Sequence, residues 1–300
     1  MKRRIVRKPA GGIQDPAPRV AGFMKRLRSV PSGADRAGWR VCAVLAVGVL
    51  ASATAQAAER YVGLAYARAT DRLVYREVHW RLAEAGVAER LVLYECANGS
   101  PFARKQLREL TSTVAPDFDF EDGRDGYREG VHTTGSKREV YVRKSRQAAL
   151  QERTLPAAQG QVIDAGFDAY VRGHWRELSS GAELAVPFLV PSRFEYLEFK
   201  FSNLRDGMLG AQSVSRLHMR LTAWYGFAFS GIELTYDRDG QRLVQFEGPA
   251  TIRGVDGRNE DVRIVFPAGE LIEDAPEAEA AQARIVPLVS SCADDSGARS

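Results

Sequence analysis

Apolar and polar residues alternate with a period of two along most of the chain after residue 57, and this pattern predicts β-strands. The longest such run spans residues 217–229. Its two faces would carry Leu217, Met219, Leu221, Ala223, Tyr225, Phe227 and Phe229 on one side, and Arg216, His218, Arg220, Thr222 and Trp224 on the other. At about 3.3 Å per residue this strand would reach about 43 Å. Such a length favours a strongly curved sheet or a partial barrel.

Shorter runs of the same kind predict the other strands. They span residues 60–67, 73–82, 87–96, 102–111, 127–133, 138–143, 194–201, 232–236, 241–251 and 261–266. Asn98-Gly99, Asp239-Gly240 and Asp256-Gly257 lie between runs, and such dipeptides accept the positive φ of tight hairpin turns. Because consecutive hairpins make neighbouring strands antiparallel, the expected fold is mainly β with one prominent helix. A long antiparallel meander would form a curved sheet or half-barrel around that helix.

One segment, residues 164–179, follows the period of a helix instead. Its apolar stripe consists of Phe167, Tyr170, Val171, His174, Trp175 and Leu178. Asp164 stands at the expected N-cap and Gly181 follows the last turn. We expect the helix to plug the concave side of the sheet, with His174 as a packed core residue and not a general base.

Residues 1–57 have the three parts of a secretory signal. An uncharged apolar run, residues 41–53, follows a basic flank and precedes the A-x-A site Ala55-Gln56-Ala57. The run is shorter than the about 20 residues that a stable transmembrane helix takes, so we expect cleavage at this site and a periplasmic protein. The alternative is an uncleaved leader that anchors the chain in the inner membrane. Because Met24 offers a second start, residues 1–23 are expected to be a start-site artefact.

The leader also accounts for the basic character of the chain, whose formal charge is +4. Residues 1–57 hold 11 of the 42 Lys and Arg residues but only 2 of the 38 Asp and Glu residues. The rest of the chain is therefore slightly acidic, and we expect no nucleic-acid partner. Residues 269–300 hold 7 acidic and 2 basic residues. This composition predicts an acidic, mostly disordered tail after a single β-rich domain at 58–268.

Removal of the leader leaves two cysteines, Cys96 and Cys292, in an oxidising compartment. They could form a disulfide that joins a strand end to the tail, and loop entropy would then stabilise the fold by about 4 to 5 kcal/mol. The alternative is a buried free Cys96 and an unpaired Cys292. Sequence leaves both open, because pairing requires the two α-carbons to approach within about 7 Å.

The motifs of known catalytic and metal sites are absent. The sequence contains no G-x-S-x-G, S-x-x-K, H-E-x-x-H, C-x-x-C, G-x-G-x-x-G or P-loop motif. Residues 117–126 resemble a calcium loop in their alternating acidic residues, but Asp122 stands where that loop needs glycine and Arg128 where it needs glutamate. We therefore expect a solvated turn there, with no metal and no cofactor. The absence of motifs favours a protein that is not an enzyme.

The candidate ligand-binding residues are aromatic. They are Tyr196, Phe199, Tyr225, Phe227 and Phe229 from the predicted strands, and Trp175 from the predicted helix. These side chains could line a pocket for an apolar ligand or fill an ordinary core, because burying an aromatic ring needs no ligand to explain it.

Three segments carry a family resemblance: DAGFDAYVRGHWREL, VPFLVPSRFEYLEF and FEGPATIRGVDGRNEDVRIVF. They are similar to an uncharacterised family of secreted proteobacterial proteins. The resemblance implies export and a β-rich fold, and it brings no known activity or catalytic residue.

The expected function is that of a non-enzymatic periplasmic protein that holds a lipid or another apolar ligand on the concave side of a half-barrel. One alternative is an enzyme of unknown class that acts on cell-envelope material, and another is a structural or interaction module of the envelope. The expected partner is an apolar ligand or an envelope protein. Membrane contact would come only through the leader if it stays uncleaved.

Overall fold

Sixteen strands are found among the residues that the computed structural model describes, which are 58–84, 86–222 and 231–292. The strands are β1 (Ala58–Ala67), β2 (Leu73–Glu84), β3 (Val87–Cys96), β4 (Pro101–Arg108), β5 (Asp117–Asp122), β6 (Arg128–Thr134), β7 (Lys137–Arg143), β8 (Gln151–Pro156), β9 (Val162–Ile163), β10 (Leu184–Val190), β11 (Glu195–Leu209), β12 (Gln212–Leu221), β13 (Ile232–Asp237), β14 (Leu243–Arg253), β15 (Asn259–Val265) and β16 (Ile272–Ala275). The predicted strand at 217–229 corresponds in its first part to β12, and its residues 223–229 lie outside the described residues.

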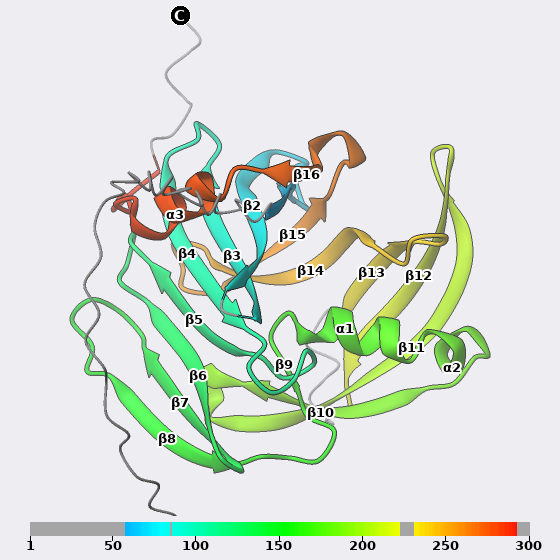
Figure 1. Cartoon of the computed structure of the whole chain (residues 1–300), viewed down its shortest axis with the longest axis horizontal. Helices are drawn as coiled ribbons and strands as arrows, with labels where there is room; N and C mark the ends of the chain where they lie inside the picture. The colour runs from blue at the N-terminus through cyan, green and yellow to red at the C-terminus, as the bar shows by residue number, and fades with distance from the viewer. Residues whose placement is uncertain (1–57, 85, 223–230, 293–300) are drawn as a thin grey trace, which may run out of the picture. The chain divides into compact units, whose positions relative to one another are not determined.

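The strands follow one another across a single sheet almost in chain order (Figure 1). β8 to β1 form a first meander, β1 pairs with β15, and a second meander runs from β15 back to β9. Neighbours in this path are antiparallel except β9 and β10, which are parallel. β8 and β9 remain as the two edges of a strongly curved sheet that does not close into a barrel. The predicted fold class, a curved antiparallel meander around a helix, is confirmed.

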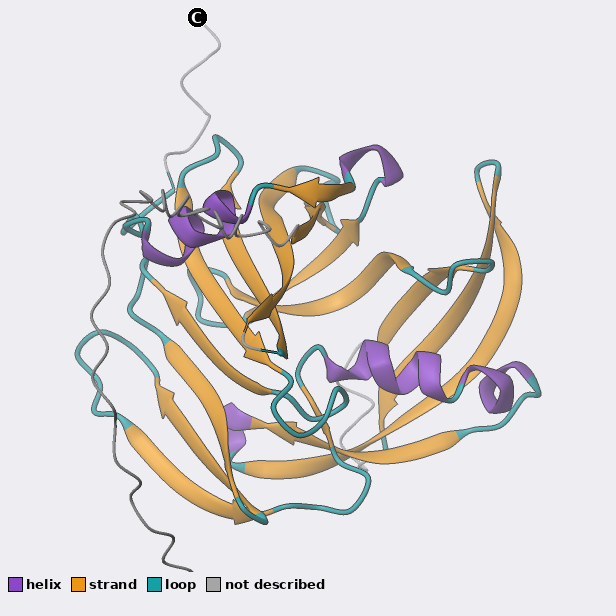
Figure 2. Cartoon of the chain, in the orientation of Figure 1, coloured by secondary structure: helices purple, strands orange, loops and turns teal. Residues whose placement is uncertain are grey.

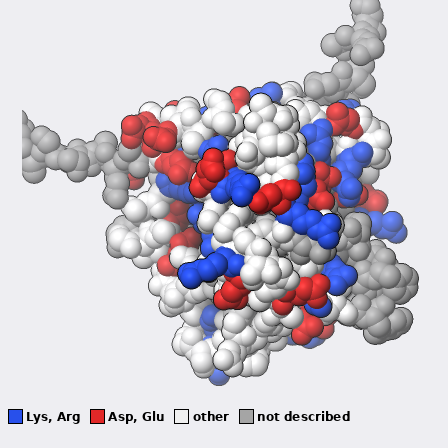
Figure 3. Space-filling model, turned by 90° about the vertical axis from the view of Figure 1, so that its right-hand side faces the viewer, with Lys and Arg blue, Asp and Glu red and all other residues white. Residues whose placement is uncertain are grey.

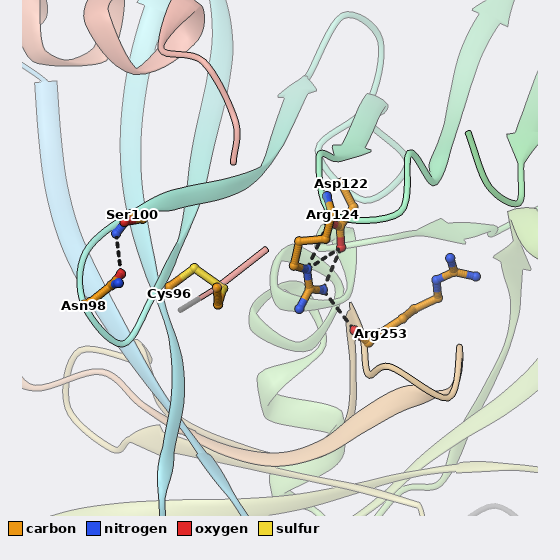
Figure 4. Close-up of a disulfide and its surroundings, with 7 residues drawn as sticks. Cys96, Asn98, Ser100, Asp122, Arg124 and Arg253 are labelled. Atoms are coloured by element: carbon orange, nitrogen blue, oxygen red, sulfur yellow. Dashed lines mark hydrogen bonds and ion pairs between the residues drawn. A yellow bond between two sulfur atoms is a disulfide. The ribbon is translucent and has the colours of Figure 1, made fainter. Parts of the chain in front are cut away.

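The tight turns depend on residues that accept a positive φ. Gly99 has φ 87°, and the Asn98 side chain accepts the Ser100 N–H at 3.0 Å (Figure 4). Gly257 has φ 76°, as its Asp-Gly turn predicts. In the turn at Asp239-Gly240 the positive φ belongs to Gln241 instead.

Two helices, α1 (Gly166–Gly173) and α2 (Trp175–Ser179), lie against the concave side of the second meander (Figure 2). Val171 and Leu178 of the predicted apolar stripe are fully buried there. The prediction of one continuous helix over 164–179 is wrong, because α1 begins at Gly166 and the chain leaves the helical conformation at His174, with φ −108° and ψ 17°. Glycine is a weak helix former, and α1 ends at Gly173.

Residues 117–122 form β5, so the prediction of a solvated turn over 117–126 is wrong for this part. Phe118 is buried, and the flanking carboxylates of Asp117 and Asp122 are buried as well. Each carboxylate has a donor: Asp117 accepts the Thr133 N–H at 2.9 Å, and Asp122 accepts from the Arg124 guanidinium at 2.7 Å. Because these donors form hydrogen bonds with the buried carboxylates, the alternating D-F-D-F segment can form a strand.

The prediction of a mostly disordered tail is also wrong for residues 269–292. After η3 (Ala268–Glu270), β16 pairs with β1, and α3 (Glu277–Ile285) packs against β3 (Figure 1). Ala280 and Ala283 are buried in a core that covers the convex face of β1 to β3. The Arg284 guanidinium donates to the Glu89 carboxylate at 2.8 Å. Two small residues three positions apart let the helix approach the sheet closely, although the segment is acidic overall.

The tail is also joined to the sheet by a disulfide between Cys96 and Cys292, whose α-carbons lie 5.5 Å apart (Figure 4). The bond links residues 196 positions apart. Beside it the Val289 N–H donates to the Pro101 carbonyl at 2.8 Å. The pairing that the cysteine count left open is therefore present.

Arg253 of β14 joins the second meander to the first across the concave side. Its guanidinium forms an ion pair with Asp125 and lies 3.8 Å from the centre of the Tyr127 ring. Its carbonyl accepts a hydrogen bond from Arg124 at 2.9 Å (Figure 4). The two meanders also meet at η1 (Pro191–Arg193), which contacts β6 and β7. The curvature of the sheet is thus held by contacts between its two halves.

Replacement of Cys292 by serine is expected to lower the free energy of unfolding by about 2 to 5 kcal/mol, because the unfolded chain regains the freedom of a long loop. Urea unfolding of the oxidised proteins measures this difference. A thiol reductant should destabilise the wild type by a similar amount and leave Cys292→Ser unchanged. Equal stability of the oxidised wild type and the variant would contradict a structural role of the bond.

Candidate functional site

The concave face of the sheet and α1 enclose a cavity of about 1010 Å³. Both meanders contribute apolar side chains to its wall. These include Leu107 and Phe118 from the first meander and Phe188, Phe199, Ile232 and Phe246 from the second. The cavity therefore exists because the sheet bends far enough for its two halves to face each other.

Only some of the aromatic residues that the sequence suggested for ligand binding line this cavity in the described part of the chain. Phe199 lines the cavity and is buried. Tyr196 and Trp175 do not line it: the Tyr196 hydroxyl donates to Gln161, and the Trp175 ring meets Tyr236 edge-on. The remaining three candidates lie outside the described residues. They are Tyr225, Phe227 and Phe229.

A buried ion pair stands in the cavity wall. Lys105 of β4 is 4% exposed, and its ammonium donates to the Asp164 carboxylate at 2.7 Å and to the Thr251 hydroxyl at 3.0 Å. The same nitrogen lies 5.6 Å from the centre of the Phe118 ring. A charge this deep in a partly apolar wall would be costly without a partner, so β4, the segment before α1 and β14 are held together here.

Asp164 does not cap α1, contrary to the prediction. It has φ 45°, and its carboxylate accepts the Ala165 N–H at 2.7 Å while it binds Lys105. The path of the chain is fixed by Gly166, where a Cβ would lie 2.1 Å from the Val114 carbonyl oxygen. No other residue fits at that position without displacing the backbone. Asp164 is thereby directed toward Lys105 and not along the helix.

A second polar pair comes from β2. Glu77 and His79 are two residues apart and share one face of the strand, and the His79 Nε2 lies 3.1 Å from the Glu77 carboxylate. The imidazole is buried and stacks on Tyr61 with ring centres 4.5 Å apart. Burial lowers the pKa of His79, against the opposite effect of Glu77. His79 is therefore neutral near pH 7.

A third polar pair lies on β6 and the turn before it. The Tyr127 hydroxyl donates to the Glu129 carboxylate at 2.7 Å. Burial raises the pKa of Glu129 above its ordinary value, and the hydrogen bond from Tyr127 works in the opposite direction. Burial also raises the pKa of Tyr127 and of Tyr94, so both phenols stay protonated at neutral pH.

The sequence carried a weak signal for these polar residues. Tyr75, Glu77 and His79 share a strand face that is buried in the structure, and charged residues on a buried face are rare unless they are paired. His174, in contrast, is half-buried at the end of α1, and its ring stacks on Tyr170 with centres 4.1 Å apart.

Two further properties concern metals and membranes. Within the described part of the chain, no group of three or more His, Cys, Asp or Glu side chains could hold a metal ion. None of the helices in residues 58–84, 86–222 and 231–292 is long and apolar enough to cross a membrane.

The surface charge is mixed. On the face shown in Figure 3, Lys and Arg side chains alternate with Asp and Glu side chains. Ion pairs such as Lys200–Glu183 at 2.8 Å and Arg238–Asp206 at 3.0 Å occur among the described residues. This face therefore carries no continuous positive patch of the kind that a nucleic acid binds.

Comparison with known proteins yields distant structural similarity alone. No protein-family model matches the chain, and no curated protein matches its sequence. A solved structure described as a beta-barrel-like protein of domain of unknown function DUF1849 from Brucella abortus is similar over 73% of this chain and 97% of that chain, with 9% sequence identity and a TM-score of 0.44. This neighbour is β-rich and uncharacterised, like the family that the sequence resembles. At this TM-score it carries no further argument, and export stays a prediction.

The pKa of His79 predicts a pH dependence of stability. The unfolded chain takes up a proton near the ordinary histidine pKa of 6.5, before the folded protein does. The contribution of neutral His79 is therefore complete above pH 6.5 and is lost as the pH falls toward the lower folded pKa. His79→Phe keeps an aromatic ring against Tyr61 but cannot take up a proton. The free energy of unfolding of this variant should therefore fall less than that of the wild type as the pH is lowered.

Urea unfolding at about pH 7.5 and about pH 5.5 measures the effect. The matched control is His218→Phe, because His218 is exposed on β12, and it should keep the wild-type pH dependence. The free energy of unfolding of His79→Phe could still fall between about pH 7.5 and about pH 5.5 as steeply as that of the wild type. In that case His79 does not cause the pH dependence of stability.

Proposed function

We propose that the protein is a non-enzymatic periplasmic binding protein that holds a lipid or a similar ligand with a large apolar part in the cavity between the sheet and α1. The observation that carries the proposal is the cavity itself, at about 1010 Å³. Sites for small organic ligands usually measure about 300 to 1,000 Å³ and are lined mainly by apolar side chains with a few polar groups. The volume lies at the upper end of this range, and the apolar side chains of the wall are accompanied by many charged ones.

The mixed character of the wall supports a ligand with an apolar part and a polar part. Apolar side chains such as Phe188 and Phe246 line the same cavity as charged side chains such as Lys105 and Arg90. A purely polar molecule would leave the apolar side chains in contact with water, and a purely apolar molecule would remove water from the charged groups. An amphipathic molecule fits a wall of this composition.

The enzymatic alternative has one observation in its favour. The Glu77 carboxylate orients His79, and a histidine held in this way can act as a general base. Among the described residues, however, the side-chain hydrogen bond of His79 goes to Glu77 and to no serine, threonine or cysteine. The geometry therefore favours binding over catalysis.

Titration with the neutral fluorescent dye N-phenyl-1-naphthylamine tests the proposal. The wild type should bind the dye saturably with one site per chain, and Phe246→Glu should weaken binding at least about tenfold, because it places a charge in the apolar wall. Phe188→Gln is a milder second variant at the same wall. Circular dichroism and urea unfolding establish that each variant is folded.

Leu150→Glu is the matched control, because Leu150 is 50% exposed and does not line the cavity. It should leave the affinity for the dye unchanged. Failure of the folded wild type to bind the dye, or equal weakening by Leu150→Glu and the two cavity variants, would contradict the proposal.

A further inference from the structure

Two arginines face each other inside the cavity wall. Arg81 of β2 and Arg90 of β3 are direct partners in the antiparallel pairing of these strands, and both line the cavity. Like charges at directly opposed positions of a sheet are destabilising. A pair of this kind on the inner face therefore calls for negative charge between or beside the two guanidinium groups.

Among the described residues a carboxylate lies at ion-pair distance from Arg81, whereas the carboxylates nearest to Arg90 act on it only from farther away. The Arg81 guanidinium lies 3.3 Å from the Glu59 carboxylate and 5.3 Å from the centre of the Tyr61 ring. Arg90 forms no hydrogen bond or ion pair with another side chain of the described residues. Burial works to lower the pKa of Arg90, but Tyr61 and nearby carboxylates raise it above its ordinary value. The guanidinium of Arg90 is thus charged and half-buried without a direct partner.

A third arginine approaches from the helix. Arg172 of α1 lines the same cavity and forms an ion pair with Asp168 at 3.1 Å. Arg90 and Arg172 also line an adjoining cavity of about 190 Å³. Three arginines from three elements thus line this end of the cavity. Glu59 and Asp168 lie at ion-pair distance from Arg81 and Arg172, which leaves Arg90 as the arginine of the three without a direct partner.

The apolar wall begins directly beside these groups. Leu107 of β4 is the pairing partner of Arg90 on the neighbouring strand and lines both cavities. Phe167 of α1 lines the large cavity as well. A ligand whose charged end lies at Arg90 would therefore place its next atoms against apolar side chains.

We propose that Arg90, together with Arg81 and Arg172, forms a subsite for the anionic head group, a carboxylate or a phosphate, of an amphipathic ligand whose apolar part fills the cavity. The inference rests on the proposed function and names the chemical class of its ligand. A guanidinium matches both anions, because its parallel N–H groups can donate to two oxygens at once.

Competition between N-phenyl-1-naphthylamine and two matched ligands, oleate and methyl oleate, tests the subsite. The two ligands share one chain and differ in the charge of the head group. Wild-type protein should bind oleate more tightly than methyl oleate. Arg90→Gln should weaken oleate at least about tenfold and leave methyl oleate within about twofold, because only the charge-assisted hydrogen bond is lost.

Two variants make the comparison specific. Arg76→Gln is the matched control, because Arg76 is an exposed residue of β2 that does not line the cavity, and it should change neither affinity. Arg90→Lys keeps the positive charge, so it should retain the preference for oleate even if Arg90→Gln fails to fold. A preference for oleate that weakens with rising salt in the wild type is expected as well.

The outcomes separate the subsite from the cavity. Equal affinity of the wild type for oleate and methyl oleate, or equal weakening of both ligands by Arg90→Gln, overturns the anionic subsite while the dye still reports a binding cavity. Absence of dye binding overturns the proposed function and the subsite with it. Calorimetry with inorganic phosphate alone should show no binding. Binding of inorganic phosphate as tight as that of oleate would overturn the head-group assignment in favour of a free anion.

Discussion

The buried ion pair between Lys105 and Asp164 is the interaction on which the interior depends. It joins β4 of the first meander to the segment before α1, and Thr251 adds β14 of the second meander. Loss of one partner from such a pair leaves an uncompensated buried charge, at a cost of about 3 to 5 kcal/mol. Because the sheet keeps two free edges, no closed ring of strand hydrogen bonds holds its halves together. The pairing of β1 with β15 joins the two meanders at one place, and side-chain contacts such as this pair and the one between Arg253 and Asp125 join them across the concave side.

The same contacts create the cavity. A sheet of this length has more inner surface than the short helices α1 and α2 can cover, so part of the concave face stays uncovered. Lys105–Asp164 fixes the first turn of α1 over one part, and the apolar residues of β10, β13 and β14 face the other part. The proposed binding of a molecule with an apolar chain and a charged end depends on this uncovered part of the concave face.

Much of the fold could be predicted from the sequence because its strands are local patterns. Alternation predicted β1 to β4 and β13 to β15 close to their observed bounds. Local patterns failed where tertiary contacts decide the structure. The acidic run at β5 forms a strand because Thr133 and Arg124 bind its carboxylates, and α3 forms because Ala280 and Ala283 fit against β3. Thr133 is 16 residues from Asp117, and β3 is far from α3 in the sequence, so the local pattern does not reveal these contacts.

The site was less predictable than the fold, because its wall combines strands far apart in the chain. The pairing of Arg81 with Arg90 follows from the register of β2 and β3, which the sequence alone does not give. Native mass spectrometry of protein purified without detergent from the producing cells tests the central claim most directly. We expect the mass of the chain plus one small amphipathic molecule, and we expect organic solvent to release that molecule. A mass equal to that of the bare chain, under conditions in which the complex of a known lipid carrier survives, would contradict it.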